Sequence, residues 1–184
     1  VSMLDCQIAI LENAIARYLS KNEIPGPMGS RHPSIAPFEA FKTKDSYIII
    51  AAGNDKLFTK LCDVLKIPET ANDERFNSNS LRCENMDQLK EIFEKQLSSK
   101  STDEWVKEME ELKIPCGPIF NIKQAVENPQ VQERNMIVKS YHKIIGEFKS
   151  AGNPIKMSTY KDENTRGDIP DLDEHREKII KEFS

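Results

Sequence analysis

The first twenty residues carry a helical pattern of apolar positions. Ile8, Leu11, Ile15 and Leu19 recur at spacings of three and four residues, with alanines among them. This spacing predicts one helix over residues 5–19. Because apolar residues lie on several of its sides, we expect the helix to be well buried.

The middle of the chain alternates between short strands and helices. A proline- and glycine-rich stretch precedes it and predicts an irregular segment. Residues 38–52 then predict a β-hairpin. Asn54 or Asp55 is a suitable N-cap for a helix over residues 56–65. Residues 86–97 have one apolar face and predict a second, amphipathic helix.

A further helix start is marked by Ser101 and Glu104, which stand in the S-x-x-E pattern of a capping box. We expect the helix that follows to turn Trp105, Met109 and Leu112 inward.

The remaining elements are shorter. Residues 121–128 and 129–135 predict two brief helices, residues 137–150 a hairpin, and residues 174–183 a last helix. The fold class is therefore mixed α/β. Residues 38–112 form a compact unit in this prediction, and both flanks look like parts of something else.

Composition narrows the possible functions. The 184 residues are 38% hydrophobic and 30% charged, with a net charge of −4 and no basic block. This balance is typical of a globular protein and argues against a nucleic-acid partner. We also expect no membrane partner, because no apolar run approaches bilayer length.

The four cysteines form no C-x-x-C pair, which favours reduced thiols in a cytoplasmic protein over a zinc site. The three histidines lie far apart, so no metal site is expected. The chain begins at Val1 without an initiator methionine, and we expect it to be a fragment.

Five residues are candidates for chemistry, although each has an ordinary structural explanation. Asp5 opens a helix, where the helix dipole favours a carboxylate in any case. Arg31 and His32 could contact an anion or belong to a solvated linker. Asn54 precedes free N–H groups that suit an anion, but a simple cap is the favoured explanation. Cys116 has no histidine partner in its vicinity, so we interpret it as part of a turn.

Short motifs recur in a fixed order along nearly the whole chain. The main ones are V-S-M-L-D-C-Q (residues 1–7), R-H-P-S-I-A-P-F (31–38), I-I-I-A-A-G-N-D (48–55), R-F-N-S-N-S-L-R (75–82), I-P-C-G-P-I (114–119) and G-N-P-I-K-M-S (152–158). As an ordered set they resemble the second half of the class III CoA-transferases. That family includes formyl-CoA transferase, carnitine-CoA transferase and the α-methylacyl-CoA racemases. The succinate/hydroxymethylglutarate-type transferases are the most similar members.

The resemblance implies a large domain with a Rossmann-like sheet, a small α/β domain, and two chains interlocked as a homodimer. Residues 1–37 and 113–184 would then be pieces of the large domain. Residues 38–112 would be the small domain.

The resemblance also implies a reaction. Asp5 would be the nucleophile that carries CoA as an aspartyl-CoA thioester between an acyl-CoA and an organic acid. Arg31, His32 and Asn54 would be candidate contacts for the acyl-CoA. The CoA thioester is a substrate, and no permanently bound cofactor or metal is implied.

Two alternatives remain open at this point. In an α-methylacyl-CoA racemase an aspartate at this place acts as a base, together with a histidine supplied from outside this chain. A relative without catalysis could instead serve in binding or assembly. The glycine-rich lid of formyl-CoA transferase has no counterpart before Arg31, which argues against its loop mechanism.

Overall fold

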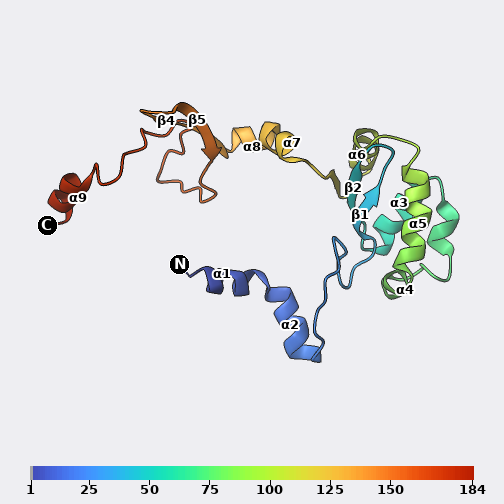
Figure 1. The fold of residues 1–184 in the computed structure, drawn as a ribbon. Helices are drawn as coiled ribbons and strands as arrows, with labels where there is room; N and C mark the ends of the chain where they lie inside the picture. The colour runs from blue at the N-terminus through green and yellow to red at the C-terminus, as the bar shows by residue number, and fades with distance from the viewer. Residues whose placement is uncertain (1) are drawn as a thin grey trace. The chain divides into compact units, whose positions relative to one another are not determined.

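The computed structural model describes residues 2–184 (Figure 1). Its contacts divide the chain into two compact units, one that ends at Ile119 and one that begins at Phe120. Each unit is described by itself.

The N-terminal segment differs from its prediction in two ways. It forms two helices, α1 (Met3–Ile10) and α2 (Glu12–Lys21), instead of one. The chain breaks at Leu11, whose N–H donates to the Ile8 carbonyl three residues back at 3.1 Å, and no proline or glycine marks the place. The predicted burial is also wrong for this chain: neither helix has a buried residue, and Met3 is 86% exposed. No core among residues 2–184 covers these apolar side chains.

The first unit contains a three-stranded antiparallel sheet. The strands are β1 (Phe38–Lys42), β2 (Tyr47–Ala51) and β3 (Cys116–Pro118), in the order β1-β2-β3. The first two form the predicted hairpin. Alternation along the strands turns Phe41, Ile48 and Ile50 into the core.

Helices pack against this sheet to form one core. They are α3 (Asp55–Val64), the 3-10 turn η1 (Pro68–Asn72), α4 (Asn79–Glu84), α5 (Met86–Leu97) and α6 (Thr102–Glu111). The Phe93 ring lies 5.8 Å from that of Phe41 and 6.2 Å from that of Phe58, so one aromatic side chain of α5 links the sheet to α3.

The capping box before α6 is confirmed. Ser101 Oγ accepts from the Glu104 N–H, and the Ser101 N–H donates to Glu104 Oε2 at 2.8 Å. Trp105 and Met109 are buried as predicted. The inward placement of Leu112 is wrong: it caps the C-terminus of the helix and is 46% exposed.

The second unit holds the predicted short elements. They are α7 (Ile122–Glu127), α8 (Pro129–Glu133), the paired strands β4 (Ile137–His142) and β5 (Gly146–Ala151), and α9 (Arg176–Phe183). Within the described part of this unit, Val138 and Ser140 are the buried residues. No helix among residues 2–184 is long and apolar enough to cross a membrane.

Candidate active site

Asp5 lies in the first turn of α1, where the sequence placed it. Ser2 caps the helix, and its Oγ accepts from the Asp5 N–H at 3.4 Å. The N-terminal turn of a helix stabilises a negative charge. Asp5 is exposed, and within residues 2–184 its carboxylate has no hydrogen-bond or ion-pair partner.

Arg31 is held between two carboxylates. Its Nε lies 2.9 Å from Glu39 Oε1, and its Nη2 lies 2.7 Å from Asp87 Oδ1. Burial acts to lower the pKa of the guanidinium, but hydrogen bonds and charge attraction to Asp87 and Glu39 outweigh burial and raise its pKa above the ordinary value. Glu39 and Asp87 therefore already neutralise part of the positive charge of Arg31.

Glu39 is a buried partner of Arg31 that the sequence prediction missed. It is buried on β1, and its second oxygen, Oε2, lies 2.5 Å from Lys90 Nζ on α5. Its inward position follows from strand alternation, two residues before the buried Phe41. A charged residue at a predicted core position was the signal that could have identified it.

His32 is packed beside the start of the sheet. Its ring stacks on Phe38 with the centroids 5.3 Å apart, and its Nδ1 accepts from the Ser34 N–H at 3.2 Å. His32 and Arg31 line a small pocket of about 120 Å³ together with Cys83 and apolar neighbours. The structure thus brings these two candidates to one place.

Asn54 is the N-cap of α3, as its favoured explanation predicted. Its Oδ1 accepts from the Leu57 N–H at 2.9 Å. The preceding Gly53 lies against Ile35, in the segment that carries Arg31 and His32. Arg31, His32 and Asn54 therefore belong to neighbouring segments. Among residues 2–184, no hydrogen bond or ion pair joins Asp5 to any of the three.

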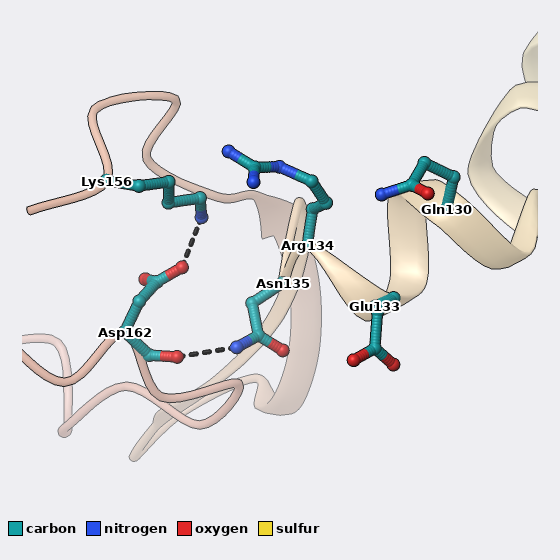
Figure 2. A pocket seen from close by; sticks show the side chains of 6 residues that line it. All are labelled: Gln130, Glu133, Arg134, Asn135, Lys156 and Asp162. Carbon is teal, nitrogen blue, oxygen red and sulfur yellow. Dashed lines mark hydrogen bonds and ion pairs between the residues drawn. The ribbon is translucent and has the colours of Figure 1, made fainter. Parts of the chain in front are cut away.

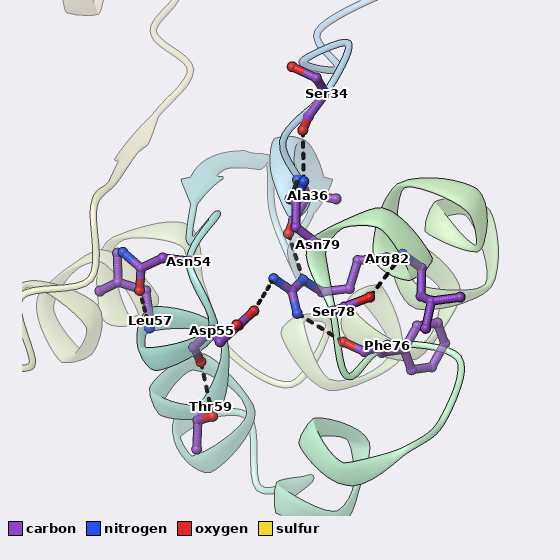
Figure 3. Close-up of polar contacts among 11 residues, drawn as sticks. Ser34, Ala36, Asn54, Asp55, Leu57, Thr59, Phe76, Ser78, Asn79 and Arg82 are labelled. Atoms are coloured by element: carbon purple, nitrogen blue, oxygen red, sulfur yellow. Dashed lines mark hydrogen bonds and ion pairs between the residues drawn. The ribbon is translucent and has the colours of Figure 1, made fainter.

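Sequence analysis also missed the buried Arg82 of α4 as a component of this region. Its guanidinium bonds to the Ala36 carbonyl, the Phe76 carbonyl and the Asp55 carboxylate (Figure 3). Arg82 is the last residue of the R-F-N-S-N-S-L-R motif, but the sequence pattern did not indicate that its side chain is buried.

Cys116 lies on β3, where its thiol donates a weak hydrogen bond to the Val106 carbonyl at 3.9 Å. Burial raises the pKa of this thiol, so it stays protonated and is a poor nucleophile at neutral pH. Its predicted place in a turn is wrong, because Cys116 begins β3 and pairs with Ile50 of β2. Within residues 2–184, no cluster of three or more His, Cys, Asp or Glu side chains could hold a metal ion.

The second unit has a polar pocket of about 350 Å³ (Figure 2). Asp162 at its edge pairs with Lys156 and with Arg166, and its backbone carbonyl accepts from Asn135 Nδ2 at 2.5 Å. Hydrogen bonds from the two cations lower the pKa of the Asp162 carboxyl. The two ion pairs lie within the loop after β5, and the Asn135 bond links this loop to the segment just before β4.

Solved structures resemble this fold. A protein described as a CAIB/BAIF family protein from Brucella suis matches with a TM-score of 0.75 and 32% identity, over 98% of this chain and 46% of that chain. The fold of this chain therefore belongs to the mixed α/β class, as does the matching part of that protein.

The sequence comparisons identify the family. The family model described as CoA-transferase family III matches residues 1–176, and the chain belongs to this family. Acetyl-CoA:oxalate CoA-transferase of Acetobacter aceti is 39% identical over 100% of this chain and 46% of its own length. Succinyl-CoA:glutarate CoA-transferase of Homo sapiens is 32% identical over 98% of this chain and 41% of its own length. The chain thus spans less than half the length of these relatives.

Proposed function

We propose that the protein containing this chain is a CoA-transferase that moves CoA from an acyl-CoA to a carboxylic acid through an aspartyl-CoA thioester on Asp5. One observation carries the proposal. In a chain that matches the family over residues 1–176, Asp5 stands in the motif V-S-M-L-D-C-Q at a helix N-terminus, and its carboxylate has no partner among residues 2–184.

In the proposed reaction the Asp5 carboxylate first accepts the acyl group of the donor and then CoA. An oxygen of Asp5 attacks the thioester carbonyl of the donor, the C–S bond breaks, and CoA leaves as the thiolate with a mixed anhydride behind it. The thiolate attacks the aspartyl carbonyl of that anhydride, which releases the donor acid and forms aspartyl-CoA. A carboxylate suits this role because its anhydride and its thioester both remain activated acyl groups.

The second half of the reaction mirrors the first. The acceptor carboxylate attacks the aspartyl thioester carbonyl, and CoA thiolate leaves again. The thiolate then attacks the acceptor's own carbonyl in the new anhydride, which gives the acceptor's CoA thioester and restores the Asp5 carboxylate. Water must stay out of the site, because it would hydrolyse either intermediate.

The substrates we propose are an acyl-CoA and a dicarboxylic acid. Oxalate and glutarate appear in the names of the two relatives above, each paired with an acyl-CoA donor. The CoA thioester is a substrate in this proposal, with no permanently bound cofactor and no metal.

The proposal includes the organisation of the enzyme. Residues 38–112 serve as its small domain, and residues 1–37 and 113–184 belong to a large domain that further sequence completes. The exposed apolar side chains of α1 and α2 support this assignment, because they need a partner surface. We further propose an interlocked homodimer and a cytoplasmic location, which suits four free cysteines.

The test is steady-state CoA transfer by the full-length protein with Asp5 changed. Asp5→Asn keeps the size of the side chain and removes the nucleophile, so we expect turnover to fall by about 10³-fold or more. Glu12→Gln, which changes an exposed carboxylate at the start of α2, is the matched control and should leave turnover unchanged. Equal turnover in wild type and Asp5→Asn would refute the assignment. Exchange of an α-proton of the acyl group without CoA transfer would favour a racemase.

A further inference from the structure

Within residues 2–184, the outer edge of β1 lies next to no other strand. In the order β1-β2-β3, β1 pairs with β2 on one side only. The Thr43 N–H just after β1 donates to the Ser46 carbonyl just before β2 at 3.0 Å. Because the backbone groups of successive residues in a strand point to opposite sides, Phe38, Ala40 and Lys42 direct their N–H and C=O groups away from β2. Such an edge is a template for pairing with a strand of another chain.

The segment just before β1 folds back along this outer edge. The His32 N–H donates to the Phe38 carbonyl at 2.9 Å, and the Ala40 N–H donates to Ser30 Oγ at 3.0 Å. Residues 30–32, called the edge strap below, therefore make hydrogen bonds that a neighbouring strand would otherwise make.

The side chain of Arg31 fastens the edge strap. Its Nε donates at 2.9 Å to Oε1 of Glu39, whose side chain is 4% exposed, and its Nη2 donates to Asp87 Oδ1 on α5 at 2.7 Å. Hydrogen bonds between a guanidinium and a carboxylate are stronger than those between neutral groups. The edge strap is thus held to β1 and to α5 by charge as well as by backbone bonds.

Two side chains of α5 cover more of the edge. Lys90 Nζ donates to the Ala40 carbonyl at 2.9 Å, and the Lys42 N–H donates to Glu94 Oε1 at 2.9 Å. Lys90 and Glu94 stand one turn apart and therefore lie on the same face of the helix. Both outward groups of Ala40 and the N–H of Lys42 are thus occupied, and an incoming strand would have to displace these partners.

The opposite edge of the sheet is protected in another way. The Ile119 N–H just after β3 donates to the Tyr47 carbonyl of β2 at 3.3 Å, so the alternation directs the backbone groups of Cys116 and Pro118 outward. β3 has only three residues, and Pro118 has no N–H to offer. Short strands and prolines both discourage pairing at an edge. The longer β1, which contains no proline, is therefore the edge that needs a cover.

We propose that the edge strap, Lys90 and Glu94 together form a blocking device that keeps β1 from pairing with β1 of a second copy of this chain. Two copies of one strand can pair about a two-fold axis, because such an interface uses the same surface twice. An antiparallel pair centred on Ala40 places Phe38 of each copy opposite Lys42 of the other, so no like charges meet. Once uncovered, the strand is therefore compatible with itself. The inference does not depend on CoA transfer.

The test removes the two side-chain acceptors of the outward N–H groups in the full-length protein. Ser30→Ala combined with Glu94→Ala does this and leaves the ion pairs of the edge strap in place. The matched control is Ser80→Ala combined with Glu91→Ala, because both residues are exposed and, within residues 2–184, neither bonds to β1. Trp105 fluorescence reports whether each variant keeps the fold of the first unit, and Ser30→Ala alone replaces the double variant if that one does not fold.

Amide exchange and sedimentation are the two readouts. In dilute solution we expect the Ala40 and Lys42 amide protons of the double variant to exchange about three- to tenfold faster than in wild type. As the concentration of this variant rises, its mass should increase above that of wild type. Exchange at both amides should then slow again, because a partner strand accepts their hydrogen bonds. Wild type and the control should keep one mass and one exchange rate.

Three outcomes would overturn the proposal. Unchanged exchange would show that the two side chains do not cap the edge. Faster exchange without a concentration-dependent increase in mass would show that an uncovered β1 does not pair. An increase in mass without renewed protection of the amides would place the contact on another surface. For Ser30→Ala alone, the same results are read at the Ala40 amide.

Discussion

The segment from Ala36 to Ile114 and the segment after Phe120 are stabilised in different ways. The first buries an unbroken set of apolar side chains between a sheet and several helices. The second has a two-stranded ribbon and short helices, and in its described part only Val138 and Ser140 are buried. The ion pairs of Asp162 with Lys156 and Arg166 lie within the long loop between β5 and α9.

The first unit therefore has a hydrophobic core of its own, whereas the second unit needs a further surface to cover its apolar side chains. A two-stranded ribbon alone is marginal in water. Apolar side chains in the second unit, among them Ile144, Ile145 and Ile155, are largely exposed. We infer that the first unit carries most of the stability of the chain and that the second is only marginally stable by itself. The following predictions test this contrast.

The largest effect should come from the aromatic centre of the first unit. Phe93→Ala removes a ring that is fully buried against Phe41 and Phe58, and should lower the free energy of unfolding by about 3–5 kcal/mol. Phe183→Ala, at an 81% exposed position of α9, is the matched control and should cost less than about 0.5 kcal/mol. Urea unfolding followed by Trp105 fluorescence measures the first unit, which contains Phe93. Amide exchange in β4 and β5 measures the second unit, which contains Phe183, and both are recorded for both variants. An equal loss in the free energy of unfolding for the two variants would contradict the proposed difference in stability between the units.

A glycine substitution should act on the second unit alone. A Cβ at Gly152 would lie 2.1 Å from the Asn135 carbonyl oxygen, so Gly152→Ala forces the backbone apart and should cost about 1–3 kcal/mol locally. Gly167→Ala, where a Cβ meets nothing within 4 Å, is the control. We expect amide exchange to quicken in β4 and β5 while the Trp105 transition stays in place. A shifted Trp105 transition would mean that the units unfold together.

The capping box offers a smaller change inside the first unit. Ser101→Ala leaves the first N–H groups of α6 without their side-chain acceptor and should lower stability by about 1 kcal/mol. Ser101→Asp restores an acceptor and should recover most of the loss. The same fluorescence transition measures both variants, and failure of Ser101→Asp to recover stability would argue against the cap as the cause.

The smallest effect should be a change in acid sensitivity. The Thr102 N–H, the Thr102 hydroxyl and the Thr43 hydroxyl donate to Asp45 and hold the pKa of its carboxyl below the usual value. Because the pKa is lower in the folded state, this stabilisation is present above the ordinary aspartate pKa of about 4 and is lost as pH falls through the folded pKa. Asp45→Asn should therefore flatten the fall in stability below pH ~4, measured by urea unfolding across pH. Asp168→Asn should retain the wild-type slope.

The sequence predicted the elements with strong local signals. The bounds of α5, the hairpin of β1 and β2 and the box at Ser101 all follow from periodicity and cap chemistry within a few residues. The break between α1 and α2 at Leu11 could not be predicted, because no proline or glycine marks it. At the break, the Leu11 N–H donates to the carbonyl of Ile8, three residues back. The prediction that the first helix is buried was wrong for this chain. An apolar face indicates that some surface covers it, but it does not indicate which polypeptide provides that surface.

The motifs selected Asp5, Arg31, His32 and Asn54 as candidates, and their functional roles stay predictions. The structure adds what surrounds these residues. Glu39 and Asp87 pair with Arg31, and Arg82 bonds to the Ala36 carbonyl. Several of these contacts join residues far apart in the chain. Such long-range contacts leave no periodic trace in the sequence, so they required the fold.

The central claim is that Asp5 becomes covalently attached to CoA. Brief incubation of the full-length protein with a panel of CoA thioesters, followed by peptide mass spectrometry, tests it most directly. We predict a CoA-sized mass increase on the peptide that contains Asp5, lost in Asp5→Asn and discharged by the acceptor acid. Transfer of CoA without any adduct on that peptide, or an adduct that persists in Asp5→Asn, would contradict the account.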